Sequence, residues 1–296
     1  MMRSITAIAA LAVLAGCGGS QADDNSSSME NRPMAAGDGL PSCYDLVDTG
    51  DAALRPLKPQ RELFVLIDQT TAFDGRLADN IQKTVAQYLG EEPVAVRVAS
   101  FSALSQGNYA TFEYAGEAER EPTDTMKSKT GMRAIEKLER CLSEQSGELA
   151  RQVERAVDGS INRASGDFQN SEIMASLSQL SDAVRRSDAS EKMVLVASDM
   201  LENSSSASFY ANSNVRKIDW QAELTKAANQ RLLGDFDNAR VAVIGAGLLP
   251  ADAQTQGVRD TEALNNLRTF WENWFANSNA ELDDAHYGQP DLMVGL

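Results

Sequence analysis

Acidic and hydroxyl side chains stand directly after the apolar runs of this sequence, where an α/β sheet would bring them together. Asp68 and Thr70 follow the apolar run 63–67, and Asp199 ends a second run that begins at Lys192. Short apolar runs bounded by polar residues are typical of strands buried on both faces of a parallel sheet. Ligands of such sheets bind beyond the carboxyl ends of the strands. We therefore expect these oxygen-bearing side chains to form a binding edge.

The remaining periodic segments predict the elements that would position this edge. The runs 94–99 and 240–246 extend the sheet, and the alternating segment 108–114 is typical of a half-exposed edge strand. Apolar residues at helical spacing predict helices over 72–88, 133–162, 171–184, 220–233 and 261–276. Strands that alternate with helices indicate an α/β fold with a doubly wound, mostly parallel sheet and helices on both faces.

The helix predicted over 133–162 is long and amphipathic. Together with the polar segment before it, it forms a helical insertion over about 116–162, and its apolar residues share one face. Such a face packs on the sheet or on a partner helix. After the insertion, Asn170 or Ser171 is placed to cap the next helix.

The first oxygen-bearing loop resembles the metal-ion-dependent adhesion site of von Willebrand factor A domains. The family's first motif is Asp-x-Ser-x-Ser. Here Asp68 supplies the acid and Thr70 the first hydroxyl, whereas Ala72 stands where the second hydroxyl would be. The resemblance covers roughly residues 60 to 278 and implies the doubly wound fold already expected. The interval between Thr70 and the family's next motif is longer than usual, because the helical insertion lies between them.

Two further loops carry the rest of this resemblance. Ser171, in Asn-Ser-Glu-Ile, takes the place of the family's Thr, and Asp199 takes the place of its last acid. The resemblance implies a degenerate site in which the two acids and the hydroxyls of Thr70 and Ser171 surround Mg²⁺ or Mn²⁺ with oxygen ligands. A carboxylate of a partner would fill the open position of the ion. The structural alternative is that Asp68 caps the following helix and Asp199 bonds loop amides.

The amino terminus is typical of an exported chain. Arg3 precedes an apolar stretch over 5–13, too short to span a bilayer as a helix, and Leu-Ala-Gly-Cys17 closes it. The segment resembles a bacterial lipoprotein signal peptide whose removal leaves Cys17 lipid-modified. The alternative is an ordinary secretory signal. By the same resemblance, Gly18 favours the outer membrane, with the protein facing the periplasm.

Composition divides the chain into four parts. Residues 1–16 form the signal peptide, and residues 17–41, rich in Ser, Asp, Asn and Gly, predict a flexible tether. Residues 42–280 fall within the size range of one α/β domain. The acidic segment 281–296 has no periodicity, and we expect it to be loose.

Two cysteines, Cys43 and Cys141, remain beyond Cys17. In an exported domain two thiols favour a disulfide, although the spacing alone leaves two separate thiols open. The formal net charge of −16 argues against nucleic acid as a partner, because the phosphate backbone would be repelled. The acids are scattered along the chain, as on a solvated surface.

These features favour a membrane-tethered protein that binds or scaffolds another envelope protein and is not an enzyme. The single histidine, His286, lies far in sequence from any Ser or Cys in a strand–turn–helix context, and no His/Cys zinc spacing is present. Gly245-Ala-Gly247 lacks the third glycine of a dinucleotide loop and predicts a tight turn. Two alternatives stay open. They are a small-molecule-binding or signalling α/β domain that uses the same edge, and a hydrolase with an unidentified nucleophile.

Overall fold

A computed structural model describes residues 39–46, 60–91, 93–102, 109–165, 170–211, 214–248 and 261–288 of the chain. The main sheet contains β1 (Arg61–Asp68), β2 (Val94–Phe101), β3 (Thr111–Glu117), β4 (Glu191–Ala197), β7 (Ala239–Ile244) and β8 (Ala280–Tyr287). A separate hairpin pairs β5 (Tyr210–Ala211) with β6 (Asn214–Val215). The helices are η2 (Tyr44–Leu46), α1 (Gly75–Glu91), α2 (Asp124–Lys129), α3 (Met132–Asn162), α4 (Ile173–Arg185), α5 (Trp220–Asn229) and α6 (Thr261–Ala276).

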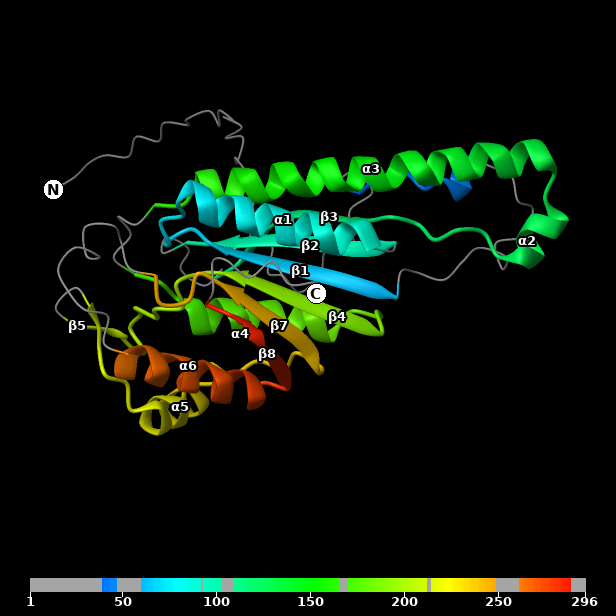
Figure 1. Ribbon diagram of the computed structural model, residues 1–296. Coiled ribbons are helices and arrows are strands. Elements are labelled where there is room, and N and C mark those ends of the chain that lie inside the picture. The colour runs from blue at the N-terminus through cyan, green and yellow to red at the C-terminus, as the bar shows by residue number, and fades with distance from the viewer. Residues whose placement is uncertain are drawn as a thin grey trace, which may run out of the picture.

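The six strands of the main sheet lie in the order β3-β2-β1-β4-β7-β8 (Figure 1). Neighbouring strands are parallel except for β2 and β3, which are antiparallel. The chain winds outward from β1 in one direction and then resumes at β4 on the other side, which is the doubly wound order. The predicted α/β fold class is therefore confirmed.

Strand β1 lies at the centre of this sheet and is buried along its whole length. Leu63, Val65 and Ile67 point to one face, and Phe64 and Leu66 point to the other. Alternation on a strand places successive side chains on opposite faces, so a continuous apolar run supplies two cores at once. This is why the run 63–67 could be assigned to a central strand.

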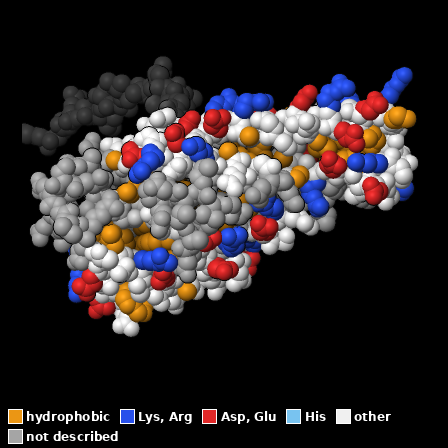
Figure 2. Space-filling view, in the orientation of Figure 1, with side chains coloured by type: hydrophobic (Ala, Val, Ile, Leu, Met, Phe, Trp, Pro, Cys, Tyr) orange, Lys and Arg blue, Asp and Glu red, His pale blue; other side chains and the backbone are white. Residues whose placement is uncertain are grey.

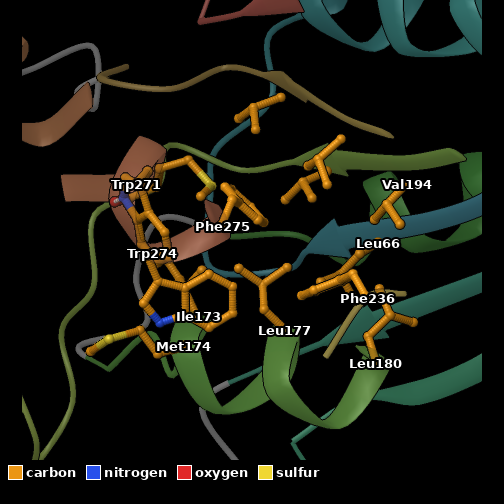
Figure 3. Packing of buried hydrophobic residues seen from close by; sticks show 14 of the residues in the cluster. Leu66, Ile173, Met174, Leu177, Leu180, Val194, Phe236, Trp271, Trp274 and Phe275 are labelled. Carbon is orange, nitrogen blue, oxygen red and sulfur yellow. Dashed lines mark hydrogen bonds between the residues drawn. The ribbon is translucent and has the colours of Figure 1, made fainter. Parts of the chain in front are cut away.

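Helices cover both faces of the sheet (Figure 1). Helices α1 and α3 lie on one face, and α4, α5 and α6 lie on the other. On the second face the aromatic side chains of α6 pack against the first turns of α4, where Figure 3 shows Trp274 beside Ile173 and Leu177. The aromatic stripe predicted over 261–276 thus belongs to the core.

Helix α3 is longer than the sheet that it covers (Figure 1). Its second half buries Leu149, Val153 and Val157 against the sheet and α1. Its first half packs on η2 and α2, where a small cluster contains Cys43, Tyr44, Met126, Leu138 and Leu142. Cys43 and Cys141 are joined there by a disulfide with Cα atoms 5.7 Å apart.

The carboxyl-terminal segment differs from the expectation of a loose tail. Residues 280–287 form β8, which pairs in parallel with the free edge of β7. Leu282 packs against the core and Tyr287 is buried. The prediction was wrong for this part of 281–296 because an acidic edge strand is stabilised by backbone pairing, which leaves little hydrophobic pattern in the sequence.

The surface carries mixed charge. Figure 2 shows basic and acidic side chains interspersed along the edge formed by α3. Ion pairs such as Arg151–Glu148 and Arg155–Glu148 connect them. Over the described ranges, no helix has the length and apolar character required to cross a membrane.

Candidate functional site

The candidate site lies between β1 and β4, at the carboxyl ends of these strands. The two strands pair in parallel up to Ile67 and Ala197, so Asp68 and Ser198 are the next residues on each side. The Ser198 hydroxyl donates to Asp68 Oδ2 at 2.7 Å. In a doubly wound sheet the winding reverses between these strands, and ligands bind in the crevice at that point.

Asp68 forms a tight local turn with Thr70. The backbone N–H and the hydroxyl of Thr70 donate to Asp68 Oδ1 at 2.8 and 2.6 Å. Such side-chain turns are characteristic of Asp. Asp68 does not cap the following helix, because Asp74 Oδ1 accepts the N–H of Leu77 in the first turn of α1. The structural alternative for Asp68 was therefore wrong.

Ser171 comes to the same place from a distant part of the chain. Its hydroxyl oxygen lies 2.9 Å from that of Thr70. Two backbone hydrogen bonds pair Ser171 with Asn203, at 2.8 and 3.0 Å. The structure thus brings Asp68, Thr70 and Ser171 together, as the resemblance implied.

Both the backbone and the carboxylate of Asp199 form hydrogen bonds. Its N–H donates to Thr71 Oγ1 at 3.1 Å, and its carbonyl accepts the N–H of Gly247 at 2.8 Å. Its Oδ1 accepts the N–H of Leu201 at 2.9 Å, and its Oδ2 accepts the phenol of Tyr210 at 3.2 Å. The predicted bond from Asp199 to a loop amide is present. Each carboxylate oxygen can accept two hydrogen bonds, so Asp199 keeps accepting capacity for a further ligand.

The backbone beside Asp199 has an uncommon conformation. Met200 has a φ of 60°, in the left-handed region, and its carbonyl accepts the indole N–H of Trp271 at 2.8 Å. Gly245 has a φ of 101°, and a Cβ at this position would lie 3.1 Å from the carbonyl oxygen of Ser198. Only glycine suits both the torsion and the close approach. The turn predicted at 245–247 therefore supports the loop that carries Asp199.

Among the residues that the structure describes, the two acids of the site have no ion-pair partner. Both Asp68 and Asp199 are buried, and among the described residues no Lys or Arg forms an ion pair with either. Burial raises the pKa of Asp68, and burial together with the charge of Asp68 raises the pKa of Asp199 well above its ordinary value. A cation placed between these carboxylates would lower both pKa values.

The side chains gathered here are of the chemical type that binds a hard divalent ion. The donors are two carboxylates and the hydroxyls of Thr70 and Ser171, which are oxygen ligands of the kind that Mg²⁺ and Mn²⁺ take. Ala72 is exposed and contributes no hydroxyl, so a water would have to stand in its place. Within the described part of the chain, no cluster of three or more His, Cys, Asp or Glu side chains suits a metal.

Several residues of the site escaped prediction from sequence. Thr71 and Ser198 stand beside the predicted ligands, and hydroxyls flanking two candidate acids are a signal that could have found them. Tyr210 and Glu202 come from the segment after β4 and carry no such signal. The helix cap predicted at Asn170 or Ser171 was wrong, since the N-cap residue of α4 is Glu172 and its side chain makes no cap bond. Cys17 lies outside the described residues.

No protein-family model matches this sequence, and a search of curated proteins found no match. Among solved structures, the chain is similar to the pilus adhesin SpaC from Lactobacillus rhamnosus GG, with 14% identity and a TM-score of 0.39. The match covers 78% of this chain and 28% of the adhesin, so the chain spans less than a third of that protein.

Two other similar structures come from bacteria. An aerotolerance-related membrane protein from Bacteroides fragilis has 13% identity and a TM-score of 0.32, over 75% of this chain and 92% of that one. A von Willebrand factor type A protein from Catenulispora acidiphila has 10% identity and a TM-score of 0.30, over 74% and 43% of the two chains. Likenesses at these TM-scores assign no family and no partner.

Proposed function

We propose that this chain is a lipid-anchored protein of the cell envelope that binds or scaffolds another envelope protein. The contact is made at the edge formed by Asp68, Ser171 and Asp199, and Mg²⁺ or Mn²⁺ completes it. The ion would be held by the two acids and by the hydroxyls of Thr70 and Ser171. When bound, it would offer an open coordination position to a carboxylate of the partner.

One observation carries this proposal. Asp68 and Asp199 are buried side by side, and no described Lys or Arg neutralises them. A buried charge without a partner is costly, so a carboxylate pair of this kind indicates a place for an external cation or a functional proton. The adjacent hydroxyls of Thr70 and Ser171 favour a hard cation, because they add oxygen donors beside Asp68.

The proposed role is not enzymatic. The histidine of the chain lies in β8, which is separated from β4 by β7, so its strand does not border the site. A serine nucleophile would need a base such as histidine within hydrogen-bonding distance. The hydroxyls of Ser171 and Ser198 instead bond Thr70 and Asp68.

Calorimetry on the full chain tests the ion. We expect Mn²⁺ to bind the wild type and not Asp68→Asn, which keeps the shape of the side chain but removes its charge. The matched control is Asp182→Asn, because Asp182 is a half-exposed acid on α4 that pairs with Arg185, away from the site. Equal Mn²⁺ heats from wild type and Asp68→Asn would remove Asp68 from the ligand set.

The same variants test the partner. Wild-type protein with Mn²⁺ should retain a defined set of proteins from solubilised envelope, which Asp68→Asn and Asp199→Asn lose and Asp182→Asn keeps. Treatment with a chelator should release the set. Identical retention by all variants would contradict binding through this edge.

The anchor is tested at Cys17. Replacement by Ser should move the protein from the membrane fraction to the soluble periplasmic fraction, because the acyl chains would be lost. Ser20→Ala, in the same polar segment, is the control and should stay with the membrane. A Cys17→Ser protein that remains in the membrane fraction would contradict lipid anchoring at this residue.

A further inference from the structure

Glu202 is a buried carboxyl group that does not belong to the proposed ligand set. Only 1% of its surface is exposed, and its Oε2 accepts the N–H of Met174 at 2.9 Å. The N–H of Ile173 also bonds this carboxyl. These are the first N–H groups of α4, which have no partner inside the helix. Glu202 therefore caps α4 from the segment that follows β4.

Backbone hydrogen bonds next to this cap also join the loop before α4 to the segment after β4. Ser171 stands two positions before the helix, and Asn203 directly follows Glu202. The backbone hydrogen bonds between Ser171 and Asn203 measure 2.8 and 3.0 Å. Two consecutive residues after β4 thus hold both the loop that leads into α4 and the first turn of that helix.

The hydroxyl of Ser171 connects the start of α4 to the candidate site. Ser171 Oγ lies 2.9 Å from Thr70 Oγ1, and Thr70 in turn bonds Asp68. The body of α4 is held by apolar packing against α6, as Figure 3 shows for Ile173 and Leu177. Ser171 precedes that packed region. Its place beside Thr70 depends on how the start of the helix is attached.

We propose that Glu202 is a positioning residue, which caps α4 from the neighbouring segment and thereby holds the Ser171 hydroxyl beside Thr70. Its effect on ion affinity rests on the proposed function. The positioning itself is independent of any ion, because it concerns the attachment of one loop to another.

The chemistry of the cap needs an acceptor more than a charge. Burial raises the pKa of Glu202 from its ordinary value to about 8, so the carboxyl is largely protonated at neutral pH. The groups that act on it are the hydroxyl of Ser204, the N–H groups of α4 and the charge of Glu172. A neutral acyl oxygen still accepts the N–H of Met174. Glutamine offers the same oxygen at the same distance along the side chain, so it should replace Glu202.

Amide hydrogen exchange on the full chain without added metal tests the positioning. In Glu202→Ala, the amides of Ser171 and Asn203 should exchange about tenfold faster, since they lose the adjoining cap. Glu202→Gln should restore slow exchange at both amides. Glu144→Ala is the matched control and should resemble the wild type, because Glu144 is exposed on α3, in a different part of the fold.

The amide of Ser198 reports on global stability in the same experiment, since it bonds Ile244 inside the sheet. Acceleration at Ser171 and Asn203 with Ser198 unchanged supports the proposal. Unchanged exchange at Ser171 in Glu202→Ala overturns it. Equal acceleration of all three amides also overturns it, because Glu202 would then stabilise the whole fold instead of this loop.

Mn²⁺ calorimetry on the same proteins separates this inference from the proposed function. Glu202→Ala should bind Mn²⁺ about tenfold more weakly than wild type, the usual effect of losing an outer-shell support, and Glu202→Gln should bind normally. Normal binding by Glu202→Ala would overturn the effect on affinity. A wild type that binds no Mn²⁺ would overturn the ion in the proposed function, and the exchange measurement would still decide the positioning.

Discussion

The hydroxyl oxygens of Thr70 and Ser171 lie 2.9 Å apart, although 101 positions separate the two residues in the chain. One hydroxyl follows the central strand β1 and the other precedes α4. Between them lie α1, β2, β3, α2 and α3. This contact locates the candidate site more narrowly than the two acids do, because a ligand that binds both hydroxyl oxygens must lie next to it.

The missing hydroxyl at position 72 gives a gain-of-function prediction. Ala72→Ser should tighten Mn²⁺ binding several-fold, up to about tenfold, because an additional oxygen ligand raises affinity. Ala72 is exposed, so the melting temperature should hardly change. Ala86→Ser, at an exposed position of α1, is the control and should leave Mn²⁺ binding as it is. Unchanged affinity in Ala72→Ser would show that residue 72 does not adjoin the ion.

Gly245 should be essential to the loop that carries Asp199. Gly245→Ala places a Cβ 3.1 Å from the Ser198 carbonyl at a φ of 101°, which should cost about 1–3 kcal/mol of unfolding free energy. Gly90→Ala is the matched control, because its Cβ would meet no atom within 4 Å. Urea unfolding of the two variants compares them directly. Equal stability would mean that the turn adapts without strain.

The disulfide should stabilise the fold without shaping the site. Cys43 and Cys141 are 98 positions apart, and the chain-entropy model gives a loop of this length roughly 4–5 kcal/mol. The double variant Cys43→Ser/Cys141→Ser should therefore unfold at lower urea concentration. Its Mn²⁺ affinity should match that of the wild type, because the bridge lies under the first half of α3 with η2 and α2. A parallel loss of Mn²⁺ affinity would contradict this separation.

The pH dependence of the unfolding free energy should reveal the ionisation of Glu202. Its pKa is raised from 4.5 to about 8 by burial, so the folded state keeps a proton that the unfolded state loses. The resulting stabilisation is complete below about pH 4.5 and is lost as the pH rises to about 8. Between these two pH values, each pH unit removes at most about 1.4 kcal/mol of the unfolding free energy.

Glu202→Gln carries no titrating proton and isolates this effect. The stability of the wild type relative to Glu202→Gln should fall as the pH rises from about 5 to about 8. Asp68 and Asp199 have raised pKa values in both proteins, so their contribution cancels in the difference. Urea unfolding across this pH range provides the measurement. Parallel stability curves would contradict a protonated Glu202 in the folded state.

Part of the architecture was readable from local pattern. The helix predicted over 261–276 has the bounds of α6, and the apolar run 63–67 lies inside β1. Both segments owe their assignment to apolar side chains whose spacing matches the element. The acidic strand β8 had no such pattern, since it is stabilised by pairing with β7.

The candidate site was also predictable from the sequence only in part. Sequence order alone placed Asp68 and Asp199 after strands, and parallel strands must end at a common edge. The order of strands, helices and polar residues along the chain therefore predicts the fold class and the oxygen-bearing side chains of that edge. Three contacts became apparent in the folded chain alone: Ser171 with Thr70, Glu202 with the start of α4, and Tyr210 with Asp199. The reason is physical: periodicity records which face of an element is buried, whereas contacts between distant loops depend on strand register and packing across the whole domain.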